Sequence, residues 1–302
     1  MGRADGQPPC TLSSLTAGES VTATAVESTD SWVLLEVPGG WAPKANDTAS
    51  LPDAVRAAWS RVSAMDRARM QFIKRGPLKS SERRIYVGSS GDKPWWYTWT
   101  LPSLEALSNA DVNAWLSGHV PHTAETVNQP LYLVCTHGKR DACCAKYGVA
   151  MYRTLSALAP DRVWQASHIG GHRFAATLLA FPTGHCFGRL SPDHAQQLFE
   201  AYEDRRLEPL ESLRGRTSMT RAEQAGAYHL RAAHDWVDLD DIRNAQTLNA
   251  QTADGERRLM FDTPKGCIEV QARAKTGNAI YGSCFKTKIQ LSVDWECKLT
   301  EP

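Results

Sequence analysis

The sequence predicts an α/β protein in which two similar halves pack together and are followed by a C-terminal β extension. Three observations lead to this fold class. Apolar strand patterns alternate with amphipathic helix patterns as far as residue 206. The same order of elements (strand, helix, three strands, helix) occurs twice in that stretch. Further strand patterns then follow and close the chain.

The first copy of this order lies in residues 31–115. Residues 31–37 form an apolar strand pattern that ends at Pro38, Gly39 and Gly40. A helix is predicted over residues 51–66, because apolar residues recur there at spacings of three and four, namely Leu51, Val55, Ala58, Trp59 and Val62. Three strand patterns and a short helix pattern follow, at residues 69–73, 84–87, 95–100 and 107–115.

The second copy begins with a strand at residues 131–134. Asp141 is placed to cap a helix that ends at Pro160 and buries Tyr147, Met151, Leu155 and Leu158. Three strands follow, at residues 162–166, 174–181 and 186–190. A helix then begins at residue 191 and is expected to bury Ala195, Leu198, Phe199 and Tyr202. The repeat predicts a duplicated thioredoxin-like half. Alternatively, two unrelated α/β segments share this order by chance.

The first copy has VPGGW where the second has CTHGK, so it is interpreted as a degenerate half that lost its cysteines. We therefore divide the chain into three segments. Residues 1–126 form the degenerate thioredoxin-like half, and residues 127–206 form the half that keeps the cysteines. Residues 207–302 form a helical segment and C-terminal strands packed on the core.

Within the third segment, Thr220 and Glu223 form a capping box for a helix that runs to about residue 236. Strands are predicted at residues 257–261, 267–274 and 286–295. Three arginines lie close together before and at the start of this helix, Arg214, Arg216 and Arg221. They are either a solvated helix start or a docking patch for an acidic partner.

Composition describes a globular chain of 302 residues, of which 42% are hydrophobic. Lys and Arg total 34 against 33 Asp and Glu, so no net field directs the protein to nucleic acid or to an anionic membrane. The first residues lack the apolar core of a signal peptide, and no stretch approaches the ~20 apolar residues of a membrane span. We therefore expect a cytoplasmic location.

Eight cysteines in a chain of this length and location are expected to be reduced thiols rather than a disulfide framework. Four of them are scattered and are expected to be small buried apolar residues without chemistry, namely Cys10, Cys267, Cys284 and Cys297.

Two motifs predict a metal or cluster site. VCTHGKRDACCAKYG holds Cys135, Cys143 and Cys144, and QASHIGGHRFAAT holds His168 and His172 on either side of two glycines. Both motifs follow predicted strands, and such loops gather at one edge of an open α/β sheet. Thiolates and imidazoles suit zinc, iron or an iron–sulfur cluster. Because eight residues separate Cys135 from Cys144, the spacing favours an object larger than a zinc ion.

The sequence resembles the sucrase/ferredoxin-like family, a branch of the thioredoxin-like ferredoxins. CTHGKRD with Cys144, SHIGGHRFAAT, and PTG with the later Gly188 and Arg189 carry the resemblance. It implies a [2Fe–2S] cluster whose ligands fall on Cys135, Cys144, His168 and His172. The family commonly has a basic residue where Cys143 stands, so Cys143 is the alternative ligand or an additional nearby thiol.

Three neighbours are expected to support such a cluster. Arg140 and Asp141 either pin the loop and hydrogen-bond to cluster sulfur, or pair with each other and cap the helix. Arg173 follows the second histidine and is expected beside the exposed pair. His137 is expected to form loop hydrogen bonds rather than to bind metal.

These expectations describe a one-electron carrier rather than an enzyme. Two thiolates and two neutral imidazoles leave an oxidised [2Fe–2S] core uncharged, which makes reduction easier than with four thiolates, and the imidazoles can couple a proton to the electron. A reductase and an acceptor, which the sequence does not name, would be its partners. The alternatives are a zinc-stabilised structural or binding protein and, less favoured by the adjacent Cys143 and Cys144, a thioredoxin-like thiol–disulfide oxidoreductase.

Overall fold

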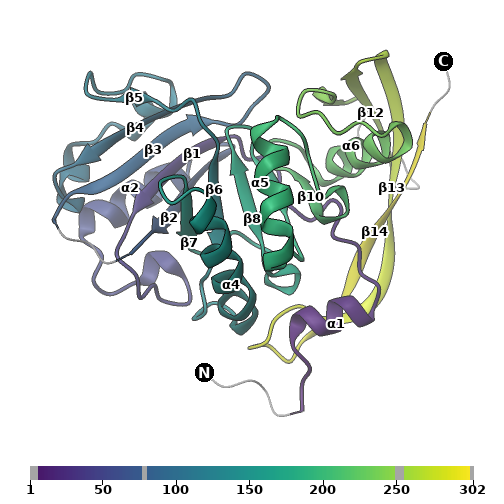
Figure 1. Ribbon diagram of the computed structural model, residues 1–302, viewed down its shortest axis with the longest axis horizontal. Helices are drawn as coiled ribbons and strands as arrows, with labels where there is room; N and C mark the ends of the chain where they lie inside the picture. Colours follow the sequence, from purple (N-terminus) through teal and green to yellow (C-terminus); the bar gives the residue numbers. More distant parts are fainter. Residues whose placement is uncertain (1–5, 77–79, 249–254, 300–302) are drawn as a thin grey trace.

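The computed structural model describes residues 6–76, 80–248 and 255–299. It is a mixed α/β structure with two sheets (Figure 1). The larger sheet is curled and has ten strands in the order β10-β9-β8-β6-β7-β2-β1-β3-β4-β5, and the smaller is antiparallel with the order β11-β12-β13-β14. No helix in these ranges has both the length and the apolar character that a bilayer span requires.

The first half of the large sheet forms around β1. It consists of β1 (Ser31–Glu36), α2 (Asp53–Ser63), β2 (Ala68–Lys74), β3 (Arg83–Ser89) and β4 (Trp95–Leu101), followed by η2 (Leu104–Asn109), α3 (Val112–Leu116) and the short edge strand β5 (Glu125–Thr126). Strand β1 pairs in parallel with β2 and antiparallel with β3, and β3 pairs antiparallel with β4. The predicted order of elements in this stretch is confirmed. The predicted apolar face of α2 is buried against this sheet.

The second half repeats these pairings around β6. It consists of β6 (Leu131–Cys135), α4 (Ala142–Leu158), β7 (Val163–Ala166), β8 (Leu178–Phe181), β9 (His185–Phe187), η4 (Pro192–His194) and α5 (Ala195–Glu203). Strand β6 pairs in parallel with β7 and antiparallel with β8, and β8 pairs antiparallel with β9. Antiparallel pairing of β2 with β7 joins the halves into one sheet.

Two stretches of the second half differ from the prediction. Residues 174–177 were expected in a strand, but β8 begins only at Leu178, because η3 (His172–Phe174) precedes it. Phe174 is buried there. The apolar pattern at this position therefore indicated a buried residue and not a strand. Strand β9 is likewise shorter than residues 186–190 and ends at Phe187.

The C-terminal segment forms the small sheet and one helix that covers it. Helix α6 (Arg221–His234) begins with the predicted capping box, in which Thr220 and Glu223 exchange hydrogen bonds. The sheet contains β11 (Arg243–Thr247), β12 (Glu256–Thr263), β13 (Gly266–Tyr281) and β14 (Ile289–Leu299). Strand β11 was not predicted, since it is polar and mostly exposed, and β13 extends far beyond residue 274. The division of the chain into three segments stays a prediction. Strand β10 (Leu213–Arg216) belongs to the third of those segments, and it pairs with β9 of the second.

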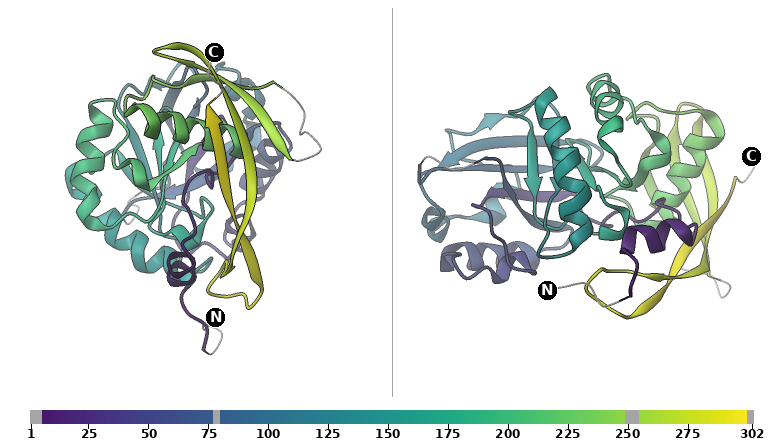
Figure 2. Two further views of the ribbon diagram at one scale, coloured as in Figure 1. Left: turned by 90° about the vertical axis from the view of Figure 1, so that its right-hand side faces the viewer. Right: turned by 60° about the horizontal axis from the view of Figure 1, so that its bottom comes forward.

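The N-terminal helix and the connection between β13 and β14 meet beside the second half. Helix α1 (Cys10–Thr16) lies against β13 and η3. Figure 2 shows α1 beside the long β13–β14 hairpin, near the connection between those two strands. The backbone nitrogen of Tyr281, at the end of β13, donates to Ser13 Oγ at 2.9 Å. The hairpin thereby brings residues 282–288 next to α1 and to the start of α4.

The arginines before α6 form neither a solvated helix start nor a docking patch, so both readings were wrong for this group. Arg214 and Arg216 are 1% and 6% exposed and donate to backbone carbonyls and side chains inside the protein. Only Arg221 reaches the surface, where it pairs with Glu27. Sequence proximity could not reveal this, because buried arginines need partners from distant segments.

Candidate metal centre

Two thiols and one imidazole from the two predicted loops meet at the edge of the large sheet. Cys135 ends β6, Cys144 lies in the first turn of α4, and His168 follows β7. Their donor atoms lie within 4.8 Å of one another, and His168 Nδ1 is 3.9 Å from each Sγ atom. Both cysteines are buried and His168 is half-buried. We call these three residues the Cys2His group.

The start of α4 lies close to β6 because Gly148 faces the strand end. A Cβ atom at position 148 would overlap the carbonyl oxygen of Cys135. At Gly138, in the intervening loop, it would lie 2.8 Å from Ala145 Cβ. Glycine at these positions therefore lets the helix approach the strand and brings Cys144 to Cys135.

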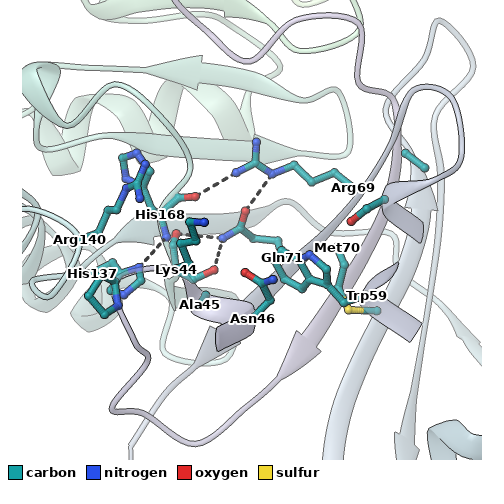
Figure 3. Close-up of a pocket in the computed structure, with 14 residues that line it drawn as sticks. Lys44, Ala45, Asn46, Trp59, Arg69, Met70, Gln71, His137, Arg140 and His168 are labelled. Atoms are coloured by element: carbon teal, nitrogen blue, oxygen red, sulfur yellow. Dashed lines mark hydrogen bonds between the residues drawn. The ribbon is translucent and has the colours of Figure 1, made fainter. Parts of the chain in front are cut away.

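Hydrogen bonds hold the backbone of His168 on both sides. Its backbone nitrogen donates to His137 Nδ1 at 3.2 Å, and its carbonyl oxygen accepts from Arg69 Nη2 at 2.9 Å (Figure 3). His137 Nδ1 is thus an acceptor, so the neutral ring donates through Nε2 to the carbonyl oxygen of Ala42 at 2.9 Å. His137 has no nitrogen left for a metal, in line with its expected hydrogen-bonding part in the loop.

The two glycines between the histidines have positive φ angles, 99° at Gly170 and 68° at Gly171. A Cβ atom at Gly171 would overlap the guanidinium of Arg214, and Arg214 Nη1 donates to the carbonyl oxygen of Gly170 at 3.1 Å. The backbone at these two glycines therefore comes close to a bulky neighbour. That neighbour is the buried Arg214 side chain.

His172 lies next to His168 but outside the Cys2His group. The two imidazole centroids are 5.0 Å apart and their planes are inclined by 31°. Nε2 of His172 lies 3.7 Å from Asp141 Oδ2, whereas its Nδ1 is buried without a hydrogen-bond partner. Burial lowers the pKa of His172 to about 4, so the ring is neutral at pH 7.

Cys143 points away from the Cys2His group. Its sulfur lies 3.6 Å from Cys10 Sγ and 3.4 Å from Cys284 Sγ. We call Cys10, Cys143 and Cys284 the three-cysteine group; Asp141 lies beside it. Cys10 and Cys284 are buried, as expected, but they lie together with Cys143 rather than scattered through the core. Both residues are so far from Cys143 along the chain that no cysteine spacing in the sequence could predict this group. Cys267 is exposed and Cys297 is half-buried, unlike the expected buried positions.

A family model described as "Sucrase/ferredoxin-like" matches residues 22–215, more than half of the chain. The chain belongs to the sucrase/ferredoxin-like family. The matched region includes Cys135, Cys144, His168 and His172, whereas Cys10 and Cys284 lie outside it. Searches of curated proteins and of solved structures found no match.

In this sucrase/ferredoxin-like protein, the half-buried Arg69 and the buried Arg214 place positive charge near the sulfur donors. Arg214 donates to Cys186 Sγ at 3.4 Å, and both it and Arg69 interact electrostatically with Cys135 and Cys186. Burial lowers the pKa of both guanidinium groups. Among the residues that the structure describes, no carboxylate pairs with either arginine. Negative charge on the Cys135 side is therefore favoured.

A hydrogen bond couples the two cysteines of the Cys2His group. It keeps the pKa of Cys135 well below its ordinary value and the pKa of Cys144 well above it. Loss of the proton from Cys135 is therefore eased and loss of the proton from Cys144 is opposed. A cation bound between them would hold both as adjacent thiolates.

Two cavities open beside the histidines of this family member. The first, about 380 Å³, is lined by both His168 and Arg69 (Figure 3), and the second, about 420 Å³, by His172 with Lys139, Lys286 and Lys288. Arg140 lines both. No Asp or Glu from the described part of the chain lines either cavity, so the histidine side of the site opens onto a basic surface.

The three expected supporting residues have different partners. Asp141 caps α4 by accepting from the backbone nitrogen of Cys143 at 3.0 Å, and it also accepts from Ser283 and Cys284. Arg140 makes no ion pair with it in the described ranges. Arg173 pairs with the buried Glu19 at 2.8 Å and also lines the second cavity.

Proposed function

We propose that this protein is a [2Fe–2S] electron-transfer protein. Cys135, Cys144, His168 and His172 would hold the cluster. The observation that carries the proposal is the convergence of two thiols and an imidazole, with a second imidazole beside it, in a family named for ferredoxins. The repeated strand pairings further support two thioredoxin-like halves, of which only the second carries the ligands.

The donor set fits the group that the family implies. Thiolates and neutral imidazoles are the ligands of mixed [2Fe–2S] centres. His172 is neutral, and its Nδ1 is buried and without a partner, so metal ligation would satisfy it. Its Nε2 would then keep the proton and face Asp141, as metal-bound histidines usually face a carboxylate. His168 presents Nδ1 to the sulfurs, so its proton belongs on Nε2.

When bound, the cluster supplies one-electron oxidation and reduction. The residues of this chain set how readily that electron is accepted. The half-buried Arg69 and the buried Arg214 are cations beside the sulfur donors and would offset the added negative charge. Nε2 of each histidine would bind its proton more tightly when the site gains an electron. We therefore infer that reduction is coupled to proton uptake at the pH values where the oxidised site has lost an Nε2 proton, and that the electron transfers without a proton at lower pH.

The redox partners would dock on the histidine side. His168 and His172 each line a cavity, whereas Cys135 and Cys144 are buried. Lys139, Lys286 and Lys288 surround this opening, so we expect the partner proteins to present acidic surfaces. Docking there would bring an acceptor closest to the imidazole ligands.

The experiment is anaerobic purification followed by visible absorption and iron and sulfide analysis of wild type, His168→Cys and His172→Cys. We expect two irons and two sulfides per chain, and a reduction potential that falls as each thiolate replaces an imidazole. Cys267→Ser, at an exposed position, is the control and should leave both unchanged.

The zinc reading remains the second candidate, because the 3.9 Å separations in the Cys2His group also suit ligands of one ion. A colourless protein that takes up one zinc at Cys135 and Cys144 after reconstitution with iron and sulfide would support that reading instead. The thiol–disulfide reading loses support, because Cys143 and Cys144 point to different groups.

A further inference from the structure

We infer that Cys10, Cys143, Cys284 and Asp141 form a second metal site, which binds a single zinc ion. This site is separate from the proposed cluster and goes beyond the proposed function. Two of its ligands, Cys10 and Cys284, lie outside the region that matches the family model. The inference therefore rests on this chain's own geometry.

The three sulfur atoms form a nearly equilateral triangle. The Sγ separations are 3.6 Å for Cys10–Cys143, 3.4 Å for Cys143–Cys284 and 3.6 Å for Cys10–Cys284. Tetrahedral zinc with bonds of about 2.3 Å holds its sulfur ligands ~3.8 Å apart. All three distances are far from the ~2.0 Å of a disulfide bond. The triangle needs to expand only slightly to accept an ion.

Asp141 stands at the fourth corner. Its Oδ1 lies 3.5 Å from Cys10 Sγ, and tetrahedral zinc separates an oxygen from a sulfur ligand by ~3.5 Å. Oδ1 also caps α4, and Oδ2 accepts from Ser283 Oγ at 2.9 Å and from the backbone nitrogen of Cys284 at 2.8 Å. These bonds fix the carboxylate in place.

The burial of Asp141 supports a cation at this point. Its side chain is fully buried, and the only basic side chain that the described residues bring within 4 Å of it is His172, at 3.7 Å. A buried carboxylate is normally paired with a cation or bound to a metal. Zinc would supply the missing charge, and the thiols would release their protons on binding.

Hydrogen bonds already surround the sulfur atoms as they do in structural zinc sites. The backbone nitrogen of Cys10 lies 3.5 Å from Cys284 Sγ, and Thr11 Oγ1 lies 3.4 Å from Cys143 Sγ. Such donors offset the excess negative charge of several thiolates around one divalent ion. The soft sulfur ligands favour zinc over magnesium or calcium.

The ion would join three distant parts of the chain. Cys10 begins α1, Cys143 lies in the first turn of α4, and Cys284 lies in the connection between β13 and β14. These elements meet beside η3, which contains His172. The ion would thus fix the N-terminal helix α1 and the connection between β13 and β14 to the helix that carries Cys144.

The test is zinc and iron analysis of wild type, Cys10→Ser, Cys284→Ser and Cys135→Ser, with half-buried Cys297→Ser as the matched control. We expect one zinc per chain in wild type, Cys135→Ser and Cys297→Ser, and at least a tenfold loss in Cys10→Ser and Cys284→Ser. Iron should be lost only in Cys135→Ser. Failure of the cluster proposal would therefore appear in the iron content, and failure of the zinc inference would appear in the zinc content.

A second measurement needs no variant. Wild type stripped of zinc by a chelator is titrated with Co²⁺ alone, and we expect one equivalent to give the visible bands of tetrahedral thiolate coordination. Zinc that disappears in Cys135→Ser but remains in Cys10→Ser would overturn the inference. A disulfide between Cys143 and Cys284 in the purified protein, or no binding of zinc or cobalt, would also overturn it.

Discussion

Cys143 and Cys144 are adjacent in the first turn of α4, yet their sulfur atoms belong to two different groups of donors. Cys144 faces Cys135 and His168, and Cys143 faces Cys10 and Cys284. Successive residues of a helix differ in direction by about 100°, so one turn can serve both groups. The capping residue Asp141 lies between the three-cysteine group and His172, since it accepts from the backbone nitrogen of Cys143 and lies 3.7 Å from His172 Nε2.

Gly148→Ala should separate the Cys2His group. The new methyl group would overlap the carbonyl oxygen of Cys135 and force α4 away from β6. We expect a loss of about 2 kcal/mol in the free energy of unfolding, together with reduced iron content. Urea denaturation and iron analysis measure both. Gly76→Ala, where an added Cβ meets nothing within 4 Å, is the control, and equal losses in the two variants would contradict this account.

Arg69→Gln should lower the reduction potential. The variant removes a half-buried positive charge that acts on Cys135, while glutamine can still donate toward the carbonyl oxygen of His168. Potentiometric titration monitored by visible absorption measures the change. Arg221→Gln removes an exposed charge that pairs with Glu27 and should leave the potential unchanged. An unchanged potential in Arg69→Gln would show that this cation does not act on the site.

The rates at which small redox reagents react with the protein should depend on the basic surface beside the histidines. Lys139→Glu and Lys286→Glu should slow oxidation of the reduced protein by an anionic reagent and speed it with a cationic one, most strongly at low salt. Stopped-flow absorption measures these rates. Lys93→Glu changes an exposed lysine that lines neither cavity, and it should have little effect. The same response in all three variants would argue against electron exchange at the histidines.

Stability should fall when the pH drops below about 6.5, partly because of His185. This ring is buried, and burial together with Arg216 and Arg231 holds its pKa far below the ordinary value. Below pH ~6.5 this histidine binds a proton in the unfolded chain but not in the folded protein. The free energy of unfolding therefore falls by about 1.4 kcal/mol per pH unit. Urea denaturation between pH 7.5 and 5.5 should therefore show a shallower loss for His185→Asn than for wild type. Identical slopes would contradict this assignment.

Much of the large sheet could be predicted from local patterns. The strands around β1 and β6, the helix face of α2 and the caps at Asp141 and Thr220 are encoded in short windows, because period and capping chemistry are local. The meeting of Cys135, Cys144 and His168 followed from one further rule, that loops after neighbouring strands share a sheet edge.

The remaining features depend on contacts between distant segments. Cys10 and Cys284 meet Cys143 only because the β13–β14 hairpin returns to α1, and no spacing in the sequence records that path. Arg214 looked like a surface residue, but Thr24, Gly170 and Cys186 accept its hydrogen bonds inside the protein. His172 was expected beside the thiols, and the side-chain direction that turns its Nε2 to Asp141 could not be predicted from spacing.

Pulsed electron paramagnetic resonance of the chemically reduced protein, prepared anaerobically with ¹⁵N-labelled histidine, tests the central claim most directly. We predict the signal of a reduced [2Fe–2S] centre with magnetic coupling to two histidine nitrogens, and coupling to only one in His172→Cys. A reduced signal without histidine coupling, or a colourless protein with zinc bound at Cys135 and Cys144, would contradict the proposed function.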